Sequence, residues 1–125
     1  HCLGRLPYRS LRFVYEHYPQ DHYQSHGVIN YTVSEDYTRI TEFKYLTGQD
    51  ISGTTIVKEY PEVYRDERQV PYYAILSPEN LKMYQKYVDY VKPFSQFYLL
   101  GRLAQYKYYN IDGIVEEALK LAETL

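Results

Sequence analysis

Four strand-like stretches joined by polar loops occupy the first half of the chain, and they constrain its fold more than any other feature. Residues 11–16 alternate between apolar and polar side chains, and residues 28–33 and 38–46 continue in extended patterns. Residues 54–60 are rich in β-branched side chains. Strands that follow one another across short loops pair in an antiparallel arrangement. We therefore expect an antiparallel sheet in this half of the chain.

The second half is predicted to carry two helices. Ser77 can cap a helix that has Pro78 in its first turn, and apolar residues recur at helical spacing until Pro93 ends it. A second amphipathic helix is predicted to begin near Asn110 or Asp112.

A short apolar run at residues 97–100 lies between these helices, and we interpret it as a buried strand. The predicted class is therefore α+β. Residues 1–93 form an antiparallel-sheet region with one helix, and residues 94–125 form a strand, a turn and a helix. A lone strand–helix pair cannot bury both of its faces, so it is expected to belong to a larger α/β domain.

Composition excludes several classes of protein. The net charge of −2 and the pI near 6.1 argue against a nucleic-acid-binding protein, which needs a basic face. No apolar run approaches the roughly 20 residues of a membrane helix, so membrane insertion is not expected. Cys2 is the single cysteine and cannot form an internal disulfide, which favours a cytoplasmic location. The chain begins at His1, as expected of a piece of a longer protein.

Three histidines, His17, His22 and His26, fall in one predicted loop. Proximity of this kind suits zinc, but no cysteine or carboxylate pattern completes a ligand set, so no metal site is expected.

Residues 101–112, GRLAQYKYYNID, are the densest candidate for a functional segment. A glycine follows the predicted strand and leads to a helix N-terminus, whose free backbone N–H groups suit a carbonyl or phosphate oxygen. Arg102 adds a planar fork of donors. The spacing alone fits a surface turn before a capped helix equally well.

Three further blocks accompany this segment in order: LPYRSLRF at residues 6–13, NYT and YTRI at 30–32 and 37–40, and EYP and PYY at 59–61 and 71–73. The four blocks resemble the C-terminal portion of UDP-galactopyranose mutases, and the resemblance extends over essentially the whole chain. The resemblance implies an isomerase that interconverts UDP-galactopyranose and UDP-galactofuranose. In that family the N5 atom of reduced FAD attacks the anomeric carbon of the sugar and displaces UDP, which later returns.

The resemblance also implies roles for individual residues. Arg39 is expected to be a catalytic residue that binds the diphosphate facing the flavin. The hydroxyl groups of Tyr73 and Tyr108 are expected to donate hydrogen bonds to the same phosphates. Arg9 supports phosphate binding less directly. Asn110 stands where the family usually has an acid near the substrate, and keeps helix-capping ability without the charge.

The flavin contacts implied by the resemblance lie in the last segment. Gly101 and Arg102 are expected beside the flavin, and the backbone at Ile111 and Asp112 at its carbonyl edge. No Gly-x-Gly-x-x-Gly follows a predicted strand, so the chain lacks the cradle for the ADP half of FAD. The isolated chain is therefore expected to bind FAD weakly and to be inactive.

Other interpretations stay open. Arg39 could pair with Glu35 or Glu42 on a strand surface, Arg9 could be a plain surface arginine, and the tyrosines, 18 in all, could mainly cover a sheet. The chain could be a stand-alone carbohydrate- or nucleotide-binding module, or a tyrosine-rich interaction domain. The apolar strand and final helix must also bury their surface, either by folding back or against a second copy in a homodimer.

The resemblance yields one geometric prediction. Arg39, Tyr73 and Tyr108 should face one concavity that admits a single diphosphate, because they match separate blocks assigned to the same ligand. A crystal structure of a full-length protein carrying this segment, soaked with UDP, tests it. Finding Arg39 and Tyr73 on opposite faces of the sheet would contradict the prediction.

Overall fold

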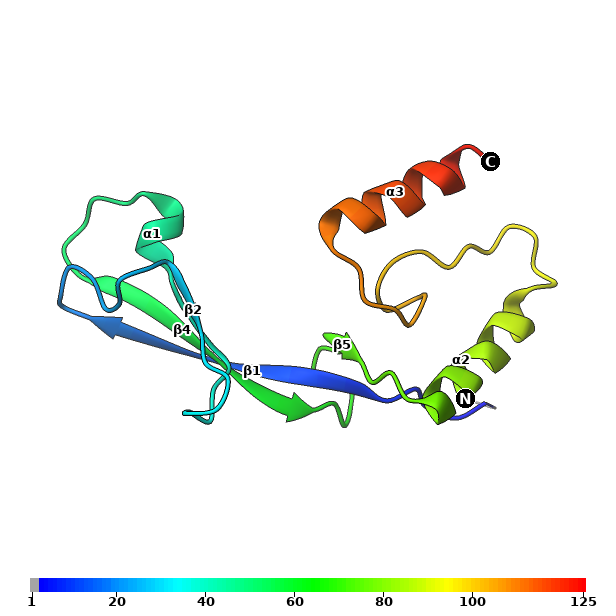
Figure 1. Ribbon diagram of the computed structural model, residues 1–125, viewed down its shortest axis with the longest axis horizontal. Coiled ribbons are helices and arrows are strands. Elements are labelled where there is room, and N and C mark those ends of the chain that lie inside the picture. Colours follow the sequence, from blue (N-terminus) through cyan, green and yellow to red (C-terminus); the bar gives the residue numbers. More distant parts are fainter. Residues whose placement is uncertain (1–2) are drawn as a thin grey trace. The chain divides into compact units, whose positions relative to one another are not determined.

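The computed structural model describes residues 3–125 and has an α+β architecture, as predicted (Figure 1). The five strands lie in one sheet in the order β2-β3-β4-β1-β5. The elements in chain order are β1 (Tyr8–Tyr18), β2 (Val28–Asn30), β3 (Arg39–Glu42), α1 (Phe43–Thr47), β4 (Thr54–Val63), β5 (Tyr73–Ala74), α2 (Pro78–Val91) and α3 (Ile111–Ala122).

The chain divides into two compact units. One unit comprises Leu11–Val63, and the other comprises Tyr64–Leu125 together with the residues that precede Leu11.

The Leu11–Val63 unit is built on an antiparallel ladder. β3 pairs with β2 on one side and with β4 on the other, so it is the central strand of the three. Ile40 on β3 and Ile56 on β4 are buried on one face of the sheet, and Val57 on β4 is buried on the other. The predicted antiparallel sheet is thus confirmed, although β2 is shorter than the predicted stretch 28–33.

The third predicted strand, residues 38–46, is wrong in its second half. The chain leaves the sheet after Glu42 and turns into α1, which contacts β4 (Figure 1). Gly48 ends this helix with a φ of 65°, a left-handed conformation that glycine adopts without steric cost. The alternating pattern of residues 43–46 therefore reflects a short half-exposed helix rather than a continued strand.

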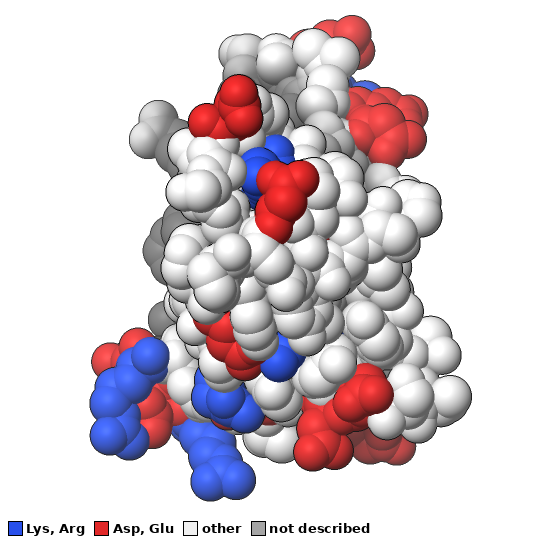
Figure 2. All heavy atoms as spheres, turned by 90° about the vertical axis from the view of Figure 1, so that its left-hand side faces the viewer, with Lys and Arg blue, Asp and Glu red and all other residues white. Residues whose placement is uncertain are grey.

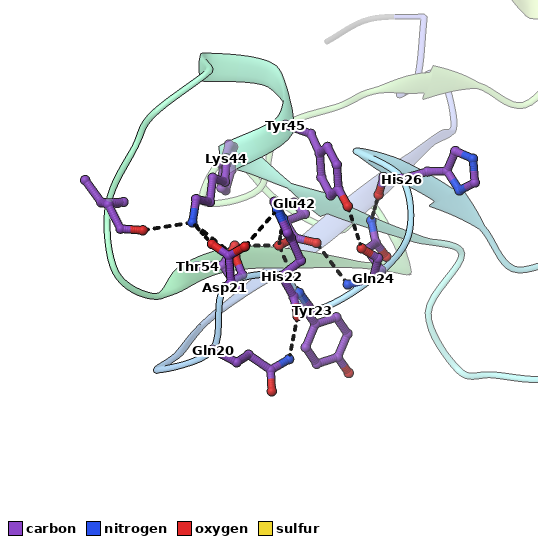
Figure 3. A network of polar contacts seen from close by, with 12 residues as sticks. Gln20, Asp21, His22, Tyr23, Gln24, His26, Glu42, Lys44, Tyr45 and Thr54 are labelled. Carbon is purple, nitrogen blue, oxygen red and sulfur yellow. Dashed lines mark hydrogen bonds and ion pairs between the residues drawn. The ribbon is translucent and has the colours of Figure 1, made fainter.

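Glu42 is the most heavily bonded buried polar residue of this unit, and Figure 3 shows the contacts that converge on it. Its carboxylate accepts hydrogen bonds from the backbone N–H groups of Tyr23 (2.9 Å) and Gln24 (3.0 Å) and from the Thr54 hydroxyl (2.7 Å). His22 Nδ1 lies 3.6 Å away. Burial alone would raise the pKa of this carboxyl, but these hydrogen bonds outweigh burial and hold the pKa below its ordinary value of 4.5.

The second unit contains a short antiparallel strand pair and the helix α2. β5 pairs antiparallel with the start of β1, matching Tyr73 to Arg9 and Ala74 to Tyr8. α2 begins as predicted: the Ser77 hydroxyl accepts from the Asn80 N–H at 3.2 Å, and Pro78 occupies the first turn.

The predicted strand at residues 97–100 is absent, because these residues belong to no strand of the described chain. A strand exists only where a neighbour accepts and donates its backbone hydrogen bonds, and no described strand pairs with this run. The final helix is confirmed as α3, which starts after Asn110.

α3 buries none of its residues. Ile111, Val115 and Leu119 are 81%, 51% and 62% exposed, whereas Leu99 and Ile114 are half-buried. The apolar stripe that the sequence predicted is therefore largely open within this unit.

Charges of both signs share the surface. On the face in Figure 2, acidic and basic side chains lie next to one another in several places, and uncharged residues cover most of the surface. None of the helices within residues 3–125 has the length and apolar character needed to cross a membrane.

We predict that Glu42→Gln destabilises the Leu11–Val63 unit by about 2 kcal/mol, since an amide nitrogen would face buried N–H donors. Because the folded pKa of Glu42 is lowered, its contribution is present at neutral pH and is lost as pH falls through the folded pKa. Urea unfolding between pH 7 and pH 3 should therefore show less acid sensitivity in the variant.

Glu35→Gln is the matched control, because Glu35 is exposed in the same unit. Equal stabilities of the Glu42 and Glu35 variants at pH 7 would contradict the role of the buried carboxylate.

Candidate functional site

Arg39 is the first residue of β3 and lies between two polar partners. Its Nε donates to Asn30 Oδ1 at 2.9 Å, and Nη1 lies 3.5 Å from Glu59 Oε1. The side chain is 42% exposed. The sequence left open an ion pair of Arg39 with Glu35 or Glu42. The structure pairs Arg39 with Glu59 instead.

The sheet face on which Arg39 lies is determined by alternation along β3. Ile40 and Glu42 are buried, so Arg39 and Thr41 point to the opposite face. A slip of one residue would expose Ile40 and the Glu42 carboxylate, which makes the register strongly specified. Backbone bonds from Thr38 N–H to Glu59 C=O (2.8 Å) and from Tyr31 N–H to Thr38 C=O (2.9 Å) fix the chain just before Arg39.

A second group of candidate residues shares one cavity of about 80 Å³ in the other unit. Its lining brings together Tyr73, Tyr108 and Arg102, three residues singled out from the sequence, and adds Lys107. The remaining lining residues are Tyr72, Ala74 and Leu76. Two cations and three phenol groups around one small cavity suit an anionic ligand.

Arg102 is held in place by the segment that follows it. Its Nε donates to the Tyr109 carbonyl at 2.7 Å, and its guanidinium lies 4.6 Å from the centre of the Tyr108 ring. Tyr108 is itself 58% exposed. This cation–π contact and the hydrogen bond orient the guanidinium at the wall of the cavity.

The backbone of Arg9 is hydrogen-bonded to the strand that carries cavity-lining residues. It pairs with Tyr73 in the β1–β5 ladder, and its carbonyl accepts the Tyr72 N–H at 2.9 Å. Its side chain is exposed.

The residues expected near the flavin lie in the turn that precedes α3 and in the first turn of that helix. Gly101 has a φ of 101°, which favours glycine, and its N–H donates to the Gln105 side chain at 3.2 Å. Asn110 is the residue before the first turn but makes no side-chain capping bond. Ile111 and Asp112 are exposed, so the free N–H groups of this helix start are open to a ligand.

Tyr106 was not singled out by the sequence analysis, yet it organises this unit. It is 1% exposed, and its hydroxyl donates to the carbonyls of Pro7 (2.6 Å) and Ile75 (3.0 Å). Its ring contacts Tyr8 edge-on and stacks with Tyr84. Burial raises the pKa of its phenol. In a run such as QYKYYN, no local signal separates the buried Tyr106 and Tyr109 from the exposed Tyr108.

Arg39 belongs to the Leu11–Val63 unit, whereas Tyr73, Tyr108 and Arg102 belong to the other. Their convergence on one diphosphate therefore stays a prediction.

The three histidines do not all lie in the predicted loop, because His17 belongs to β1. His17 Nδ1 lies 3.1 Å from the Thr55 hydroxyl, and His22 stacks on Tyr45. Within residues 3–125, no three His, Cys, Asp or Glu side chains are grouped to hold a metal ion.

Comparison with known proteins assigns the chain to a family. A family model described as UDP-galactopyranose mutase matches residues 1–108. The chain belongs to this family.

Members of the UDP-galactopyranose mutase family from several bacteria align along nearly the whole chain. The UDP-galactopyranose mutase of Mycoplasma pneumoniae is 35% identical over 130 residues, covering 100% of this chain and 33% of the relative. The probable UDP-galactopyranose mutase of Klebsiella pneumoniae is 36% identical over 122 residues, covering 96% and 31%.

A dTDP-fucopyranose mutase of Escherichia coli is 33% identical over 123 residues, covering 96% of this chain and 32% of that protein. The chain thus spans about a third of the length of the curated relatives that it matches.

We predict that Tyr106→Phe destabilises the unit that holds the cavity by about 1–2 kcal/mol, because two carbonyls lose their donor. Urea unfolding followed by circular dichroism measures this. Tyr90→Phe is the control, since Tyr90 is 58% exposed on α2. The same midpoint for both variants would show that the Tyr106 hydroxyl has no anchoring role.

Proposed function

We propose that this chain is the C-terminal portion of a flavin-dependent mutase that interconverts UDP-galactopyranose and UDP-galactofuranose in the cytoplasm. The observation that carries the proposal is the family match over residues 1–108, together with 35% and 36% identity to proteins named as such mutases. Because the chain spans about a third of those relatives, the isolated segment is proposed to be inactive.

The substrate residues are assigned by their chemistry. Departure of UDP places negative charge on the diphosphate, and cations and hydroxyl donors stabilise that charge. Arg39 is the proposed catalytic contact, Tyr73 and Tyr108 donate hydroxyls, and Arg9 supports them from the adjacent strand. Asn110 lies close to Tyr108 in sequence and is proposed to contact the substrate without the family's usual charge.

Residues 94–125 are proposed to form part of the FAD-binding domain. The open start of α3 fits a flavin carbonyl edge, because backbone N–H groups at Ile111 and Asp112 have no intrahelical acceptor. Arg102, fixed by the Tyr109 carbonyl, and the positive-φ Gly101 complete the contact. When bound, reduced FAD supplies the N5 nucleophile, and these residues orient the flavin and bias its charge.

The comparisons support a nucleotide-sugar mutase more strongly than they support one particular nucleotide sugar as its substrate. The Escherichia coli relative named dTDP-fucopyranose mutase is 33% identical, close to the identity of the UDP-galactopyranose mutases. What both names share is a pyranose carried on a nucleoside diphosphate, so recognition of the diphosphate by Arg39 and the two tyrosines fits either.

We predict that Arg39→Lys in a full-length protein carrying this segment lowers kcat by about a hundredfold, since lysine lacks the planar bidentate fork. The measurement is conversion of UDP-galactofuranose to UDP-galactopyranose by dithionite-reduced enzyme, followed by liquid chromatography. dTDP-fucofuranose is assayed in parallel.

Arg12→Lys is the matched control, because Arg12 lies in the same unit and pairs with Glu62 at 3.0 Å. If the wild-type protein converts neither sugar nucleotide, the proposed function is wrong. If Arg39→Lys retains full kcat, Arg39 is not catalytic.

A further inference from the structure

Arg39 stands in a row of three polar side chains that crosses the sheet. Asn30 on β2 and Glu59 on β4 are its direct register partners on either side. Residues directly opposite in neighbouring strands project from the same face, so the three side chains are adjacent. The two contacts are the Nε–Asn30 hydrogen bond at 2.9 Å and the Nη1–Glu59 ion pair at 3.5 Å.

We propose that Asn30 and Glu59 are positioning residues that orient the Arg39 guanidinium toward a diphosphate. This inference rests on the proposed role of Arg39 in the mutase. Arginine carries five N–H donors. Asn30 accepts from the Nε–H and Glu59 accepts from one hydrogen of Nη1, which leaves the second hydrogen of Nη1 and both hydrogens of Nη2 for phosphate oxygens. One hydrogen from each of Nη1 and Nη2 forms the parallel pair that matches two phosphate oxygens.

Glu59 is able to orient Arg39 because it is fixed more firmly than the arginine. The Glu59 side chain is only 13% exposed, against 42% for Arg39. The Glu59 backbone carbonyl also accepts from the Thr38 N–H at 2.8 Å and from the Thr38 hydroxyl at 3.3 Å. An arginine held in this way loses less rotamer freedom when an anion binds, and a pre-oriented donor stabilises developing charge without reorganisation.

The same unit contains a second ion pair that serves as an internal reference. Arg12 Nε donates to Glu62 Oε1 at 3.0 Å, and the Arg12 guanidinium lies 4.2 Å from the centre of the Tyr60 ring. Glu59 and Glu62 are both on β4, where Glu59 pairs with Arg39 and Glu62 pairs with Arg12.

The first test measures orientation directly, in this chain, by nuclear magnetic resonance of the arginine Nε–H groups. The Arg39 Nε–H of the wild type should exchange slowly with solvent. Asn30→Ala should accelerate that exchange by about tenfold, and Asn30→Asp, which keeps an acceptor, should restore it. The Arg12 signal should persist in both variants.

Unchanged Arg39 exchange in Asn30→Ala, or no rescue by Asn30→Asp, overturns the role of Asn30. If Asn30→Ala loses the Arg12 signal as well, and is therefore unfolded, Asn30→Val, which has no acceptor and suits a strand, replaces it with the same expected acceleration.

The second test measures catalysis in a full-length protein carrying this segment. Asn30→Ala and Glu59→Ala should each lower kcat about tenfold while KM changes by less than about threefold, because the orientation matters most as charge develops on the diphosphate. Glu62→Ala should keep kcat within about twofold of the wild type.

Equal kcat values for the Glu59 and Glu62 variants overturn the role of Glu59. A wild-type protein that turns over neither nucleotide sugar refutes the proposed function instead, and the exchange measurement still decides whether Asn30 orients Arg39.

Discussion

The buried carboxylate of Glu42 is the interaction on which the Leu11–Val63 unit depends. It ties the loop at Tyr23 and Gln24 to the end of β3 and to Thr54 on β4. Few apolar side chains are buried in either unit, so a polar residue that joins distant segments carries an unusual share of the organisation. Tyr106 does the same elsewhere, where one hydroxyl joins segments about thirty and a hundred residues apart in sequence.

The secondary structure could be predicted where the signal is local. The Ser77-Pro78 start of α2 and the apolar spacing of α3 need no information from distant residues, and both helices form. The errors lie where distant residues decide. Residues 43–46 alternate as a strand would, but α1 replaces the strand once Glu42 is buried. The apolar run at 97–100 needs a neighbouring strand, which its own sequence cannot supply.

The candidate site follows the same division. Family blocks identified Tyr73, Tyr108 and Arg102, and the structure brings these three to one cavity. Asn30 and Glu59 escaped notice as partners of Arg39, because cross-strand neighbours follow from the register, and a register cannot be derived from one strand alone. The assignment of roles to all these residues stays a proposal.

Because the apolar stripe of α3 is uncovered, the stability of this helix depends on what packs against it. A helix of 12 residues is marginal in water when nothing packs against it, and α3 buries none of its residues. As long as Ile111, Val115 and Leu119 remain exposed to solvent, the backbone amides of α3 should exchange at rates close to those of a fraying peptide. Any surface that covers this stripe, whether from the rest of a longer protein or from another molecule, would slow amide exchange in α3 before it altered the sheet.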